Sequence, residues 1–163
     1  MFEKFGEMDS FLEINELADN LMNEGDEKSV MALAEENGIE KEAAKAYINA
    51  YQAGEMMDLC DAADAAAGKI DMECRELKPK EIMQDWVDYI SVQCQENEEV
   101  ALGVRKKGKT LKGCIAALLM WSFRNQQQID KEITKAAGIN ARVTLGIPGM
   151  GRAKKIIREY YLS

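Results

Sequence analysis

Apolar residues recur at helical spacing along most of this chain, and single glycines interrupt the pattern. The clearest stripe repeats at i, i+4 and i+8 and consists of Ile82, Trp86, Val87, Ile90 and Cys94. Residues at this spacing lie on one face of an α-helix, so the stripe predicts an amphipathic helix that follows Pro79. Only two prolines and 7% aromatic residues occur among the 163 residues, which favours helices over a strand-rich sandwich.

The other segments extend this pattern to a mostly α-helical bundle of seven to nine helices. Capping residues and glycines predict helices within residues 10–24, 26–37, 39–53, 80–96, 97–107, 110–123, 130–137 and 152–161. Residues 55–78 predict one long or twice-broken helix, with Gly68 as the expected break and Met56, Leu59 and Cys60 on its buried side. The segment LKGCIAALLMWSF is apolar around nearly its whole circumference and predicts the central helix of the core. Residues 142–145 predict the only extended piece.

Charge divides the sequence into two unequal parts. The whole chain carries 29 acidic and 21 basic residues, a net charge of −8. Residues 1–99 contain 26 acidic and 8 basic residues, whereas residues 100–163 contain 3 and 13, so the two parts have net charges of −18 and +10. We expect an acidic helical unit over residues 1–77 and a helical core unit with a basic surface over residues 78–163, either separate or joined in one continuous domain.

The residue types present exclude several kinds of chemistry. The chain has no histidine, which excludes histidine-based triads, histidine-ligated metal sites and histidine pH switches. The four cysteines form no CxxC pair and are expected to be reduced thiols on apolar helix faces. Asp58, Asp61 and Asp64 recur every third residue, but nothing nearby could shift the pKa of one carboxyl, and the spacing is not that of an EF-hand. We therefore expect a solvent-facing acidic stripe, and a non-enzymatic protein with no cofactor and no metal.

The sequence also bears on location. No stretch of about 18 apolar residues occurs, and the first residues, MFEKFGEMDS, lack a basic region followed by an apolar one. We expect a soluble, unsecreted cytoplasmic protein that does not bind membranes.

Two short segments are similar to DNA-binding motifs. Residues 31–51 have the rhythm of a helix-turn-helix, but their acidic surroundings would repel phosphates, so we interpret them as a helical hairpin. The segment GIPGMGRAKKII resembles the hairpin of a helix-hairpin-helix motif, in which glycine N–H groups grip a DNA phosphate. That resemblance implies that Gly149 and Gly151 face the phosphate, with Lys154 or Lys155 beside them. The alternative is a tight connection in which Ile147 and the methionine after Gly149 plug the core.

A wider resemblance involves the acidic helical head and the segments EIMQDWVDYI, KGCIAALLMWSF and LGIPGMGRAKKIIREYYL. Together they resemble small proteins carried by bacterial phages and conjugative elements, and LKGCIAALL is similar to part of the PcfK-like group, whose later His- and Tyr-rich segment is missing here. The resemblance implies a mobile-element accessory protein in the cytosol of a bacterial host. Some proteins in such neighbourhoods are anti-CRISPR inhibitors, which are small, often acidic and usually not enzymes.

Three interpretations of the charge pattern remain open. In the first, the acidic helical surface occupies the positively charged channel of a CRISPR effector nuclease in place of nucleic acid, and exposed methionines add adaptable contact area. The residues expected on this protein-binding face are Glu35, Glu36, Glu42, Glu55, Met56, Met57, Asp58, Asp61, Asp64 and Asp71.

In the second interpretation, the protein is a DNA- or RNA-binding accessory protein whose basic C-terminal unit contacts phosphates. The expected nucleic-acid-binding residues are Arg105, Lys106, Lys107, Lys109, Gly149, Gly151, Arg152, Lys154, Lys155 and Arg158. In the third, the acidic and basic halves neutralise each other, either within one chain or between the copies of a head-to-tail homo-oligomer. A mixed version of the first two would contact protein and nucleic acid together.

Overall fold

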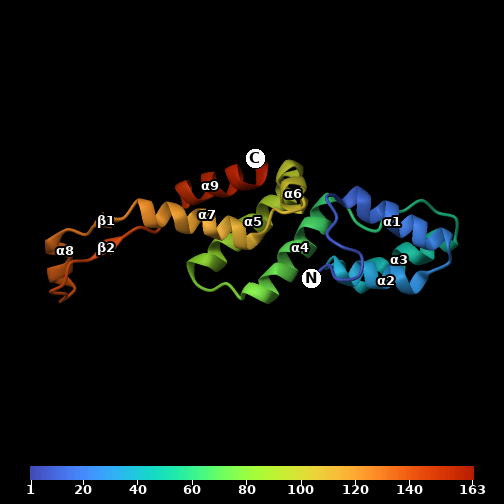
Figure 1. Cartoon of the computed structure of the whole chain (residues 1–163), viewed down its shortest axis with the longest axis horizontal. Coiled ribbons are helices and arrows are strands. Elements are labelled where there is room, and N and C mark those ends of the chain that lie inside the picture. The colour runs from blue at the N-terminus through green and yellow to red at the C-terminus, as the bar shows by residue number, and fades with distance from the viewer.

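The computed structural model describes all 163 residues and confirms a mostly α-helical fold (Figure 1). The elements in chain order are α1 (Phe11–Asn23), α2 (Glu27–Glu36), α3 (Lys41–Gln52), α4 (Ala62–Leu77), α5 (Ile82–Glu96), α6 (Glu98–Arg105), α7 (Leu111–Arg124), β1 (Gln127–Gln128), α8 (Lys131–Ala136), β2 (Thr144–Leu145) and α9 (Met150–Leu162). The molecule is elongated, with α1, α2 and α3 at one end and β1, β2 and α8 at the other. None of the helices combines the length and the apolar character that crossing a bilayer requires.

The expected capping residues start most of these helices. The side chains of Ser10, Asp26, Asn97, Thr110 and Asp130 each accept a hydrogen bond from a backbone N–H in the first turn of the helix that follows. Such bonds satisfy N–H groups that have no partner inside the helix. The stripe from Ile82 to Cys94 forms the buried face of α5, as its spacing predicts.

The side chains form two hydrophobic clusters that meet at α4. The N-terminal cluster comes from α1, α2 and α3, together with Leu59, Cys60 and Ala65. The C-terminal cluster comes from α4, α5, α6, α7 and α9, and includes Ala66 and Ile70. Ala65 of α4 belongs to the N-terminal cluster, whereas its neighbours Ala62 and Ala66 belong to the C-terminal one, so the two clusters pack on different sides of α4.

The expected break at Gly68 is wrong, because Gly68 lies in the middle of the continuous helix α4. A glycine is required there by packing. A Cβ atom on Gly68 would lie 2.2 Å from the carbonyl oxygen of Asn37, and one on Gly38 would lie 2.4 Å from the carbonyl oxygen of Gly68. The turn between α2 and α3 therefore contacts α4 backbone to backbone, where no side chain fits.

The expected helix over residues 55–60 is also wrong, because this segment is a loop and α4 begins only at Ala62. Leu59 and Cys60 of this loop are buried, whereas Met56 is fully exposed, so these three residues do not form the buried side of a helix. Asp58, Asp61 and Asp64 consequently do not form a helical stripe. Asp61 is the N-cap of α4, and the side chains of Asp61 and Asp64 accept each other's backbone N–H in a capping box.

Helix α7 is not the central core helix that its composition predicts. Only Leu111, Cys114 and Leu118 are buried, and the exposed fractions of Leu119 and Phe123 are 65% and 79%. The first half of α7 packs against α4 and α9, while the second half extends beyond the body of the molecule (Figure 1). An apolar circumference shows that a helix can be buried on every side, but neighbours must be present to cover it.

The chain from the second half of α7 to the start of α9, residues 119–150, forms a projecting arm. The strands β1 and β2 pair antiparallel, with Gln127 opposite Leu145 and Gln128 opposite Thr144, and α8 lies at the tip. The extended piece expected near residues 142–145 is confirmed in part as β2, but its partner β1 was not predicted. Helix α8 has no buried residue, and Pro148 is the only buried residue of the arm.

Candidate functional site

Buried polar residues join the two cores. Arg105 of α6 is only 1% exposed, and its Nη2 donates to Oδ1 of Asn37, 2.7 Å away, at the end of α2. Its guanidinium lies 5.2 Å from the ring centroid of Phe2, and its Nε and Nη1 have no hydrogen-bond partner. Burial lowers the pKa of Arg105. Arg105 therefore cannot contact phosphates from the surface, as the sequence had led us to expect, because it bridges α6 and α2 inside the protein.

The N-terminal segment pairs with the basic loop that follows α6. Lys69 of α4 is fully buried, and its Nζ donates to Glu7 at 2.8 Å and to the carbonyl oxygen of Lys106 at 3.0 Å. The Asp9 carboxylate accepts the backbone N–H of Lys107 at 2.9 Å. Carboxylates from the acidic half thus hold the basic loop at residues 106–108 in place. The loop takes part in these bonds through its backbone, and all five ion pairs of the structure join residues within one half, so no ion pair neutralises the opposite charges of the two halves.

The remaining basic residues do not form one surface. Lys109 donates to the carbonyl oxygen of Tyr160 at 2.8 Å and closes the end of α9, while Arg158 donates to Gln93 at 3.2 Å. Arg152 lies over the Trp121 ring and Lys154 over the Tyr89 ring. The expected nucleic-acid-binding cations that remain exposed are Lys106, Lys107, Arg152, Lys154 and Lys155, and they are divided between the loop after α6 and helix α9.

The turn before α9 does not belong to a helix-hairpin-helix motif, because the element that precedes it is the strand β2 and not a helix. Gly149 is the N-cap of α9, and Gly151 lies in its first turn. The alternative expectation is also wrong in one respect, since Ile147 and Met150 are 59% and 39% exposed and neither plugs the core. The turn is tight nonetheless. A Cβ atom on Gly146 would lie 2.4 Å from the carbonyl oxygen of Ser122 on α7.

The residues expected on one protein-binding face are spread over several elements. Glu35, Asp64 and Asp71 line a cleft, whereas Glu55, Met56, Met57 and Asp58 lie on the loop between α3 and α4. Glu36 is not available to a partner, because its carboxylate accepts the backbone N–H groups of Lys4 and Phe5 at 3.1 Å. Glu42 lies 4.0 Å from Lys45 in an exposed pair on α3.

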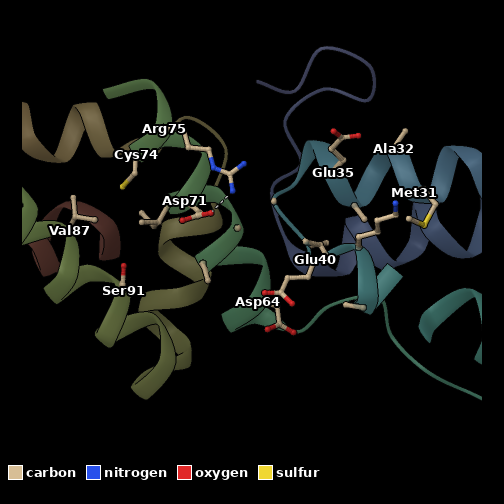
Figure 2. A pocket seen from close by; sticks show the side chains of 18 of the residues that line it. Met31, Ala32, Glu35, Glu40, Asp64, Asp71, Cys74, Arg75, Val87 and Ser91 are labelled. Carbon is tan, nitrogen blue, oxygen red and sulfur yellow. Dashed lines mark hydrogen bonds and ion pairs between the residues drawn. The ribbon is translucent and has the colours of Figure 1, made fainter. Parts of the chain in front are cut away.

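The cleft has a volume of about 1210 Å³ and lies between the α2–α3 hairpin and helices α4 and α5 (Figure 2). Its apolar lining includes Ile39, Ile70 and Val87. Charges of both signs surround this lining: Asp71 pairs with Arg75 at 2.9 Å, and Glu40 and Asp64 lie close together on facing elements. Because four cations and five carboxylates line it, the cleft has no strong electrostatic preference for one kind of charged ligand.

Carboxylates without a paired cation lie around the loop between α3 and α4, beside α1. We call Asp19 of α1, Asp58 of the loop, and Asp61 and Asp64 at the start of α4 the acidic edge. The Tyr47 hydroxyl donates to Asp19 at 2.6 Å, and burial raises the pKa of Tyr47, with Asp19 and Asp58 adding to the rise. Burial likewise raises the pKa of the Cys60 thiol to about 12, and Asp64, Asp61 and Asp58 contribute. None of these four carboxylates forms an ion pair, and the cation that opposes their effect on Cys60, Arg105, is buried.

A buried asparagine holds the acidic edge in position. Asn15 of α1 is 8% exposed; its Oδ1 accepts the N–H groups of Leu59 and Cys60 at 3.0 and 3.1 Å, and its Nδ2 donates to the carbonyl oxygen of Cys60 at 2.9 Å. The loop therefore has fixed backbone geometry although it is not helical. Sequence reasoning missed Asn15. The available signal was an amide beside Ile14 in the apolar stripe of α1, where an inward-facing polar side chain needs a partner.

The structure contains no group of three or more Cys, Asp or Glu side chains arranged to hold a metal ion. No protein-family model matches the sequence, and comparisons with curated proteins and with solved structures likewise find no match.

Proposed function

We propose that this protein is a non-enzymatic inhibitor of a nucleic-acid-guided nuclease, of the anti-CRISPR type carried by mobile elements, and that it binds its target through the acidic edge. One observation carries the proposal: carboxylates from three separate segments surround a fixed scaffold, with Asp19 and Asp58 acting on Tyr47 and Asp58, Asp61 and Asp64 acting on Cys60, while the one cation that acts on Cys60 with them, Arg105, is buried. The channels of such nucleases are positively charged and hold nucleic acid through its phosphates. Carboxylates presented by a rigid surface can occupy the same positions.

Exposed apolar residues beside the acidic edge support a protein partner. The exposed fractions of Met56 and Met57 are 102% and 47%, and the two side chains stand between Glu55 and Asp58. Methionine side chains adapt to irregular surfaces and supply apolar contact area that a purely acidic patch lacks. The expected interface therefore combines charge complementarity, which accelerates and directs binding, with an apolar centre that slows dissociation.

The alternative function, nucleic-acid binding by the C-terminal unit, receives less support. Arg105 is buried, Lys109 and Arg158 are engaged within the protein, and the remaining cations are divided between two elements. Phosphate binding is strongest where several cations lie along one track that follows the nucleic-acid backbone.

A cleavage assay tests the proposal. The purified protein is added to representatives of the common CRISPR effector types, each with its guide and target, and we expect cleavage by one of them to be inhibited. The variant Glu55→Lys/Asp58→Lys should lose this inhibition because it reverses two charges next to Met56 and Met57 without touching the capping box. The matched control is Glu96→Lys/Glu99→Lys, which makes the same change in net charge on exposed positions of α5 and α6 and should inhibit like the natural protein. Unimpaired cleavage by every effector type would refute the proposal.

A further inference from the structure

The arm exposes an apolar surface that nothing in the chain covers. It holds eight of the sixteen large hydrophobic side chains exposed on the whole molecule, although it makes up only residues 119–150. On α7, Ala116, Leu119, Met120 and Phe123 lie at i, i+3, i+4 and i+7 and are all exposed, which is the spacing of a helix face that packs against a partner. Ile133, Leu145 and Ile147 extend the apolar character over the rest of the arm.

The arm also lacks the means to stabilise itself. Its two strands are two residues long, its helix α8 has no buried side chain, and only Pro148 is buried along its length. A two-stranded ribbon of this kind is marginal in water without a surface to pack on. Monomeric proteins rarely expose contiguous apolar area on this scale unless it is an interaction site.

The charge of the arm indicates what it binds. Residues 119–150 carry four basic and two acidic residues, whereas residues 11–64 carry three basic and fourteen acidic residues. Three large apolar side chains within residues 11–64 are exposed: Leu12 on α1, and the neighbouring Met56 and Met57 on the loop between α3 and α4. Each region therefore offers exposed apolar side chains, and the two regions carry net charges of opposite sign, +2 and −11.

The helices α5, α6, α7 and α9 lie between the arm, at one end of the long axis, and the part of the molecule that holds α1 and the start of α4, so the arm and the acidic edge cannot meet within one chain (Figure 1). We propose that the arm of one copy docks on the acidic edge of a second copy, with Phe123 and Met120 facing Met56 and Met57, and that the protein associates head to tail. Because the two contacting patches differ, a pair of copies keeps one free patch of each kind, and the contact propagates into longer chains unless a ring closes.

This inference does not rest on the proposed function, although both use the acidic edge. If both hold, a target protein and a second copy compete for the same residues. Nucleic acid is a weaker candidate for the arm, because its exposed large apolar side chains outnumber its four cations.

Complementation between two variants tests the head-to-tail contact by sedimentation velocity. The natural protein should grow in mass with concentration and return toward the monomer at high salt. The arm variant Met120→Ser/Phe123→Ser and the edge variant Met56→Ser/Asp58→Lys each lose one patch, so each alone should be monomeric. An equimolar mixture should form a dimer and nothing larger, because each variant still has the patch that the other lacks. Val92→Ser/Leu102→Ser removes exposed apolar side chains elsewhere and should leave association unchanged.

Each other outcome overturns the inference. A natural protein that stays monomeric at every concentration and low salt excludes self-association. Association of the natural protein without recovery in the mixture would show a symmetric contact between like patches. Loss of a DNA gel shift in the arm variant, with no self-association of the natural protein, would assign the arm to nucleic acid. Circular dichroism establishes that the variants fold, and the cleavage assay separates the two proposals, since the arm variant should still inhibit the nuclease.

Discussion

Replacing Gly68 by alanine should destabilise the protein, although a glycine in the middle of a helix normally costs stability. Helix propensity alone favours Gly68→Ala by about 1 kcal/mol. The structure opposes this gain, because the new Cβ atom would lie 2.2 Å from the carbonyl oxygen of Asn37 and 2.9 Å from that of Gly38, well inside the 3.4 Å at which ordinary contact begins. Both neighbours are backbone atoms and cannot rotate away. Overpacking of this kind costs about 1–3 kcal/mol or more, and here it must separate α4 from the α2–α3 turn.

We expect a net loss of about 2 kcal/mol in the free energy of unfolding, which corresponds to a fall in Tm of about 4–8 °C for a chain of this length. Urea titration and thermal melting followed by circular dichroism measure both quantities. Gly151→Ala is the matched control, since Gly151 is also helical and a Cβ atom there would meet nothing within 4 Å; its stability should be unchanged or raised. A Gly68→Ala protein as stable as the natural one would refute the close backbone contact that joins the two cores.

Three further predictions concern buried polar groups and thiols. Asn15→Ala removes the hydrogen-bond acceptor of the Leu59 and Cys60 N–H groups and should lower the free energy of unfolding, measured in urea, by about 2–4 kcal/mol. A loss below about 1 kcal/mol would show that water replaces the amide. Burial raises the pKa of Glu73 above its usual 4.5, so the free energy of unfolding of the protein should fall as the pH rises through and above that value. Glu73→Gln can still accept the N–H of Leu111 and should make the free energy of unfolding less dependent on pH in this window. An unchanged slope would contradict this prediction. Cys74 is half-buried, whereas the other three thiols are buried and have a pKa raised to about 12. Iodoacetamide at mild alkaline pH should therefore modify Cys74 first, which mass spectrometry measures. Equal labelling of all four cysteines would contradict the packing.

Local signals in the sequence predict the helices well, because caps and apolar stripes act within one or two turns. The caps at Ser10 and Thr110 and the buried face of α5 depend only on neighbouring residues. The errors at Gly68 and α7 have another origin. Whether a glycine breaks a helix or admits another backbone depends on what packs against it, and whether an apolar face is buried depends on how far its neighbours extend.

The same limit explains what could be predicted of the candidate site. Composition identifies the acidic unit, but the helical spacing that placed Met56 on a buried face was misleading, because residues 55–60 form a loop on which Met56 is exposed. The assignment of Arg105 to the surface failed because a run of cations near a helix end looks the same in sequence whether it faces solvent or Asn37. Asp61 and Asp64 both belong to the acidic edge, but they are neighbours because they form the capping box of α4 and not because they lie on one helical stripe. Reversing their charges would remove the cap of α4, so they are poor positions for such a test.

The most direct test of the central claim is displacement of nucleic acid from the inhibited nuclease. Fluorescence anisotropy of a labelled target DNA, bound to the guide-loaded enzyme, is followed while this protein is added. If the acidic edge occupies the nucleic-acid channel, the natural protein releases the DNA, the release weakens as salt rises, and Glu55→Lys/Asp58→Lys loses it while Glu96→Lys/Glu99→Lys retains it. Inhibition of cleavage with the DNA still bound, or equal loss of displacement in both variants, would contradict the account.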